Sequence, residues 1–362
     1  MSEREESCTG AGDGFRRLRI AITVDPEIPV PPLLYGGIER IVDMLVRGLL
    51  QRGHGVTLFG HPDSNVPCDL SPYPCLRSRE MRDTMTNMRH VSSTIARGGF
   101  DLVHSFARLA YLAPLLPRTI PKIMSYQREI ASRSVRLGIL LSRGSLHFTG
   151  CSAHVIQRWA SYANFHVIYN GVSLNTYHAT ESVGEGAPLI CLGRVEEIKG
   201  VHLAIEVARA SGRRLIIAGN VPNEPSHQRY FREKIAPQVD GCAVTYVGAV
   251  NDVAKNDMLG QSAALLIPLL WEEPFGIVMA EALACGTPVI GLRRGSLPEI
   301  VEHGVNGFIC ESVPEMISAV AQVSLLDRRD CRRTVEQRFG DQVVVDAYER
   351  LYWQLVRERG SD

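Results

Sequence analysis

The 362-residue sequence contains no apolar run that approaches the roughly 20 residues needed to cross a membrane as a helix. It also lacks an apolar signal core near its start, where MSEREESCTGAGDG is polar and rich in glycine. We therefore expect residues 1–17 to form a disordered lead-in and the protein to be cytoplasmic.

The sequence also lacks paired cysteines, because its nine cysteines are scattered without a CxxC spacing. Several of them, such as Cys191 and Cys310, lie in apolar runs where cysteine acts as a small buried hydrophobe. No DxD-type metal-binding pattern is evident. The sequence therefore predicts no disulfide framework, no bound metal and no cofactor.

Neither sign of charge is in excess, with 39 basic and 39 acidic residues. Residues 1–175 hold 20 Lys and Arg against 14 Asp and Glu. Because this positive excess is modest, nucleic acid is not an expected partner. A weak peripheral contact of this half with a membrane is left open. The stretch Arg128–Arg143 mixes arginines with apolar residues, which suits a membrane surface, an acceptor-binding face or packing on a sheet. We favour an acceptor-binding face or packing on a sheet over a membrane surface.

Both halves of the chain begin with a strand, a loop and a helix. Arg19–Val24 reads as the first strand, and Pro188–Gly193 as a buried strand before the helix Val201–Ala210. This repetition predicts an α/β protein with two Rossmann-like domains that face each other. We place them at residues 18–180 and 187–342.

The segment Trp271–Gly291, WEEPFGIVMAEALACGTPVIG, reads as a loop, a helix and a strand. The predicted helix is Ile277–Ala284, and its N-terminus offers unpaired N–H groups and partial positive charge to a phosphate. Gly276 lets a ligand approach the backbone closely. Glu273 and Glu281 would lie on either side of a bound diphosphate and accept hydrogen bonds from sugar and ribose hydroxyls. The pattern predicts a nucleotide-sugar site.

Two further features suit ligand binding at strand ends. Arg194 and Lys199 leave the carboxyl end of a strand on one loop, where two cations could grip a diphosphate. His104 would lie at the end of the strand Phe100–Ser105, where open α/β sheets place ligands. The alternative is a hydrogen-bonded core histidine, and both interpretations stay open.

The glutamate pair in EPFGIVMAEALACGTPVIG, followed by GSLPEIVEHGVNGFIC, resembles the signature of family 4 glycosyltransferases of the GT-B fold. The resemblance extends more weakly over residues 19–341. It implies an acceptor domain and a donor domain across a deep cleft, with the helix near residues 343–358 crossing back onto the first domain. It also implies transfer from a nucleoside-diphosphate sugar, most often a UDP-sugar, to a hydroxyl acceptor with retention of configuration.

The resemblance assigns roles to further residues. LGRVEEIKG, from Leu192 through Gly193, is similar to the family's phosphate-gripping segment, and YGGIER sets Gly36 and Gly37 against the donor phosphate. Backbone near Val250 would contact the base. Relatives often carry a histidine where this chain has Gln127, and glutamine hydrogen-bonds without titrating near neutral pH.

The turn and first helical residue of the signature, Phe275 and Ile277, belong to the expected donor site. Catalysis would rest on Glu273, Arg194 and Lys199, with His104 added if it reaches the ligand. Two alternatives remain. One is a non-catalytic nucleotide-sugar-binding relative, which Gln127 favours; the other is a different GT-B enzyme, such as a nucleotide-sugar epimerase.

Overall fold

The computed structural model describes residues 17–32, 36–128, 130, 132–162 and 164–360. Residues 1–16 of the expected lead-in, and Tyr35 of the YGGIER motif, lie outside the described residues. None of the described helices has both the length and the apolar character required to span a bilayer.

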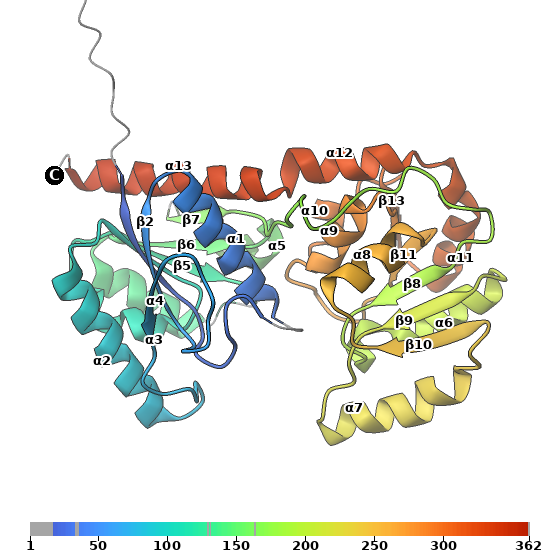
Figure 1. Cartoon of the computed structure of the whole chain (residues 1–362), viewed down its shortest axis with the longest axis horizontal. Helices are drawn as coiled ribbons and strands as arrows, with labels where there is room; N and C mark the ends of the chain where they lie inside the picture. Colours follow the sequence, from blue (N-terminus) through green and yellow to red (C-terminus); the bar gives the residue numbers. More distant parts are fainter. Residues whose placement is uncertain (1–16, 33–35, 129, 131, 163, 361–362) are drawn as a thin grey trace, which may run out of the picture.

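Two parallel sheets organise the chain, one in each half (Figure 1). The first has seven strands, whose spatial order is β3 (Asp69–Pro72), β2 (Gly55–Gly60), β1 (Arg19–Thr23), β4 (Leu102–Ser105), β5 (Lys122–Tyr126), β6 (Leu146–Gly150) and β7 (Phe165–Val167). The second has six, in the order β10 (Val244–Gly248), β9 (Leu215–Ala218), β8 (Leu189–Leu192), β11 (Ala264–Ile267), β12 (Val289–Leu292) and β13 (Gly307–Cys310). The α/β prediction with two Rossmann-like sheets is confirmed.

Helices cover both faces of each sheet, which is why central strands such as β4 and β11 are buried along their whole length. Those of the first half are α1 (Gly37–Gln51), α2 (Met81–Gly98), α3 (Leu109–Leu112), α4 (Ser132–Ser142) and α5 (Ala153–Ile156). Those that follow are α6 (Val201–Ala210), α7 (Pro225–Tyr230), α8 (Asp252–Gly260), α9 (Ile277–Ala284), α10 (Leu297–Ile300), α11 (Val313–Gln322), α12 (Arg328–Arg338) and α13 (Asp341–Gly360).

The last two helices connect the two halves. In Figure 1, α12 lies over the second sheet and α13 continues along the same edge of the molecule to the first. Tyr348 and Tyr352 of α13 are buried in the core that α1 makes with the first sheet. Gly48 of α1 allows this contact, because a Cβ added there would lie 2.5 Å from Val345. The C-terminal helix thus completes the hydrophobic core of the first half.

The strand order reverses at one point in each sheet, between β1 and β4 and between β8 and β11. In open parallel sheets, ligands bind outside the carboxyl ends of the strands at such switch points. The loop after β8 carries Arg194 and Lys199, the loop after β11 carries Glu273 and Gly276, and the loop after β1 leads to Gly36. The topology therefore brings the predicted loops to the places where this fold binds ligands.

His104 of β4 lies in the core of the first half and not on its surface. Its side chain is fully buried, with Nδ1 2.5 Å from the Tyr352 hydroxyl and Nε2 2.6 Å from Ser125 Oγ. Burial lowers the pKa of His104 from 6.5 to about 3, so the ring is neutral at physiological pH. The structure fits the core interpretation, and His104 is left out of the proposed site.

This buried ring makes stability depend on pH. The unfolded chain protonates His104 near pH 6.5 but the folded protein only near pH 3, so protonation in this range favours unfolding. From pH 7 to pH 5, His104 is expected to lower the free energy of unfolding by about 2 kcal/mol. Urea unfolding at both pH values checks this. His104→Gln should lose that much less stability between them, and an equal loss in both proteins would refute the prediction.

Candidate donor-binding site

Two loops at the switch point of the second sheet are held against each other by their backbones. The loop after β8 runs through a 3-10 helix, Glu197–Lys199, and the Ile198 carbonyl of that helix accepts a hydrogen bond from Leu270 N at 2.9 Å. Gly200 makes the approach possible: its φ is 69°, and an added Cβ would lie 1.9 Å from the Pro268 carbonyl oxygen. The end of the 3-10 helix is therefore fixed beside the loop after β11.

Lys199 and Glu273 meet where these loops touch. Lys199 Nζ donates to Glu273 Oε2, and Trp271 Nε1 donates to the same oxygen at 3.2 Å. The Lys199 ammonium also lies 4.8 Å from the centre of the Trp271 ring. The two side chains remain 21% and 13% exposed, respectively. The carboxylate is thus oriented by two donors, and the ammonium is held by a carboxylate and an aromatic face.

The helix α9 begins four residues after Glu273. Gly276 is its N-cap residue, with φ 68°, and an added Cβ would lie 2.7 Å from the Met279 side chain. No side chain caps this end of the helix. Because the first turn of a helix presents N–H groups without intrahelical acceptors, this terminus suits an anionic oxygen.

The backbone around this turn is supported from the next loop. Ser296 N donates to the Glu273 carbonyl at 2.9 Å, and Ser296 Oγ donates to the Phe275 carbonyl at 2.8 Å. The Phe275 side chain is 2% exposed and packs near the rings of Tyr169 and Phe339. Phe275 is thus a core residue that anchors the turn, so a donor contact by its side chain is not supported.

Glu281 lies in the second turn of the same short helix and is almost fully buried. Its Oε1 accepts hydrogen bonds from the Tyr177 hydroxyl at 2.8 Å and from Lys255 Nζ at 2.5 Å. Lys255 also pairs with Asp252 at 3.2 Å. Glu281 therefore forms a buried ion pair with Lys255. The sequence pattern does not reveal these contacts.

The same cluster reaches the first half of the chain. Asp252 of α8 forms an ion pair with Arg40, one turn into α1. Burial would raise the pKa of Asp252, but the charges of Lys255 and Arg40 outweigh it and lower the pKa. Burial and the charges of Glu281 and Asp252 raise the pKa of the Tyr177 hydroxyl well above its usual value. At neutral pH, the Tyr177 hydroxyl therefore keeps its proton and donates a hydrogen bond to Glu281.

Arg40 links the predicted glycine pair, Gly36 and Gly37, to the cluster of Asp252, Lys255 and Glu281. Its amide donates to the Gly36 carbonyl at 3.1 Å, so Gly36 and Gly37 lie in the turn that precedes the ion pair. A Cβ added at Gly37 would meet nothing within 4 Å. Val250 lies two residues before Asp252, at the carboxyl end of β10. Gly36, Gly37, Val250 and Glu281 thus belong to one neighbourhood.

Arg194 lies at the start of the loop after β8 and pairs with the buried Glu196 at 2.9 Å. Gly193, just before it, faces open space, since an added Cβ would contact nothing within 4 Å. Arg194 is 37% exposed, so part of the guanidinium is accessible. The two predicted cations are therefore on one loop but have different carboxylate partners.

Gln127 follows β5, and its side chain is held by another residue of the first half of the chain, Asn170. Its Oε1 accepts a hydrogen bond from Asn170 Nδ2 at 2.7 Å. Nearby, Cys151 Sγ contacts the Pro274 carbonyl at 3.6 Å, which joins the first half to the turn before α9. Ile277 packs against the hydrophobic cores of both halves. These contacts bring the end of β5 close to the Gly276 turn.

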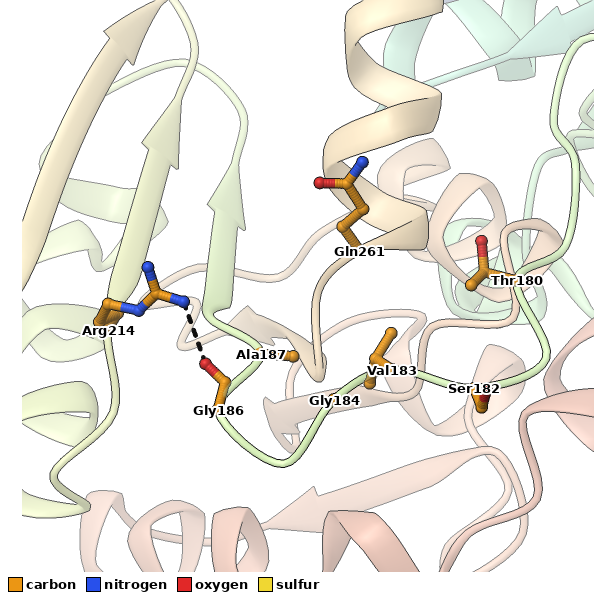
Figure 2. A pocket seen from close by; sticks show the side chains of 8 residues that line it. All are labelled: Thr180, Ser182, Val183, Gly184, Gly186, Ala187, Arg214 and Gln261. Carbon is orange, nitrogen blue, oxygen red and sulfur yellow. Dashed lines mark hydrogen bonds between the residues drawn. The ribbon is translucent and has the colours of Figure 1, made fainter.

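A separate pocket of about 390 Å³ lies at the linker, between residues 180–187 and the side chains of Arg214 and Gln261 (Figure 2). None of the predicted site residues lines it. At the edge of this pocket, Arg214 donates a hydrogen bond to the Gly186 carbonyl at 3.1 Å.

Within the described part of the chain, no three His, Cys, Asp or Glu side chains gather as a metal site would require.

Two family models match the chain, Glycosyltransferase Family 4 over residues 35–176 and glycosyl transferases group 1 over residues 178–338. N-acetyl-alpha-D-glucosaminyl L-malate synthase of Bacillus anthracis is 32% identical over 123 residues, 32% of each chain. AviGT4, a glycosyltransferase involved in avilamycin A biosynthesis, is 25% identical, with a TM-score of 0.69 over 94% of this chain and 98% of that one. Anabaena HepE in complex with UDP-glucose is 18% identical, with a TM-score of 0.69 over 96% and 100%. These likenesses confirm the GT-B fold.

Proposed function

We propose that this chain, which belongs to the family 4 (group 1) glycosyltransferases, transfers a sugar from a nucleoside-diphosphate donor to a hydroxyl acceptor. The observation that carries the proposal is the contact of Lys199 with Glu273 beside the uncapped start of α9. This arrangement puts a cation, a carboxylate and helical N–H groups at the switch point of the second sheet.

The chemistry that this arrangement supports is departure of a diphosphate. As the glycosidic C–O bond breaks, negative charge grows on the leaving oxygen and positive charge on the anomeric carbon. Lys199, Arg194 and the start of α9 would stabilise the leaving group electrostatically, which usually contributes the largest share of such catalysis. Three groups of this kind can replace a divalent metal ion, so we expect turnover without added metal.

The two glutamates would have different tasks. Glu273 is partly exposed and oriented by two donors, so it would hold hydroxyls of the transferred sugar. Glu281 would accept from the ribose while Lys255 and Tyr177 keep its carboxylate in place. Gln127, held by Asn170, would hydrogen-bond the sugar without moving a proton.

The finer features rest on resemblance. A UDP-sugar is the proposed donor, in line with the UDP-glucose complex of the structurally similar HepE. Retention of configuration is proposed on the same basis. The described site residues of the first half contribute no carboxylate to these contacts, which is compatible with reaction on one face of the sugar and without a covalent intermediate.

The test is a panel of nucleotide sugars incubated with purified protein, with hydroxyl acceptors and mass-spectrometric detection. The proposal predicts that one donor is converted to its nucleoside diphosphate together with a glycosylated acceptor or the free sugar. Binding of a donor without any conversion would favour the non-catalytic relative. An epimer formed without acceptor would identify a different GT-B enzyme.

A further inference from the structure

The outer side of α4 carries an exposed apolar ridge. Leu137, Leu140 and Leu141 are 56%, 75% and 43% exposed, although leucine is normally a core residue. Val135 and Gly138 face inward, and a Cβ added at Gly138 would lie 3.1 Å from Leu146 of β6. The helix thus has a conventional inner face and a second apolar face that is largely exposed to solvent.

Arginines accompany these leucines. Arg133 and Arg136 are exposed on α4, and Arg143 follows its end. At 100° per residue, Arg133, Leu137 and Leu140 follow one another along the outermost line of the helix. Residues 132–143 contain no aspartate or glutamate, and residues 101–175 hold eight basic residues against two acidic ones. The ridge is therefore basic as well as apolar.

We propose that α4 is a membrane-contact helix that lies on the surface of an anionic bilayer. Leucines interspersed with arginines suit this interface. The apolar side chains enter the boundary of the acyl chains, while the guanidinium groups reach the lipid phosphates. The positive charge is complementary to an anionic lipid surface. This assignment replaces the interpretation of Arg128–Arg143 as merely packing on the sheet, and it does not depend on the transfer reaction.

A second copy of the chain fits this face less well. In a two-fold symmetric contact, α4 of one protomer would face α4 of the other, so Arg133 and Arg136 would oppose like charges. No acidic residue of the helix offsets that repulsion. A contact that buries the leucines therefore needs a partner that is negative and apolar together, which is the character of an anionic bilayer.

The experiment is sedimentation of the full chain with vesicles of phosphatidylcholine, with and without phosphatidylglycerol. We expect binding to the anionic vesicles only, weakened by salt. Leu137→Ser/Leu140→Ser should weaken binding on the order of tenfold for each leucine. Arg133→Glu/Arg136→Glu should weaken it about fivefold or more for each charge.

Matched controls lie in the second half of the chain. Leu325→Ser removes a leucine that is more exposed (82%) than those of α4, and Arg229→Glu/Arg232→Glu reverses two exposed arginines. Both should bind vesicles as the wild type does, and thermal unfolding should be unchanged in all four variants. The proposal is overturned if anionic vesicles are not bound, or if the α4 variants bind them like the controls. It is equally overturned if light scattering shows a dimer that Leu137→Ser/Leu140→Ser abolishes.

Discussion

Lys199→Ala is expected to lower kcat by about 10²–10³-fold while the protein remains folded. The ammonium lies beside Glu273 and the start of α9, where it would stabilise the departing diphosphate. Lys199→Arg should not restore the rate, because a planar guanidinium cannot replace a compact ammonium between the Trp271 ring and a carboxylate. The measurement is steady-state kinetics with the donor that the panel identifies.

The chain offers a matched control for this prediction. It contains only four lysines, and Lys234 is exposed on the same half of the molecule. Lys234→Ala should leave kcat and the unfolding temperature unchanged. A Lys199→Ala protein with nearly wild-type kcat would remove this residue from the mechanism and leave Arg194 and α9 as the candidate leaving-group contacts.

Glu273→Gln is expected to lower kcat/KM by roughly a hundredfold. Glutamine keeps the size of the side chain but loses the negative charge that pairs with Lys199. It therefore disturbs both the orientation of the cation and the hydrogen bonds that Glu273 would accept from the sugar. Because the two residues act as a unit, we expect Lys199→Ala/Glu273→Gln to be little slower than the slower single variant.

Glu272 is the control for Glu273, since it is adjacent in sequence but 50% exposed and paired with Arg294 at 3.4 Å. Glu272→Gln should keep most of the activity and show a similar unfolding curve. If Glu272→Gln and Glu273→Gln slow the reaction equally, the effect comes from the loop's general charge, and the assigned role of Glu273 is wrong.

Local patterns in the sequence were sufficient for much of the fold. The helices α6 and α9 have the predicted bounds, because each follows a buried strand and contains good helix formers. The strand β3 (Asp69–Pro72) could not be predicted, because it is short, polar and half-exposed at the sheet edge. Its pairing with β2 depends on the tertiary arrangement.

The partners of the site residues depend on contacts between distant parts of the chain. Lys255 binds Glu281 across 26 residues, and Arg40 pairs with Asp252 across 212. Neither spacing follows from periodicity, although the scarcity of lysine could have drawn attention to Lys255. A polar residue at a strand end can also face either way, which is why His104 could not be assigned from sequence.

We propose above all that a diphosphate binds at the start of α9, beside Lys199 and Arg194. Isothermal titration calorimetry can test it with the nucleoside diphosphate that a thermal-shift panel selects and the monophosphate of the same base. We expect the diphosphate to bind about tenfold to a hundredfold more tightly than the monophosphate. We also expect Lys199→Ala and Arg194→Ala each to reduce this difference in affinity. Equal affinity of the wild-type protein for the two nucleotides would show that the start of α9 does not bind the second phosphate.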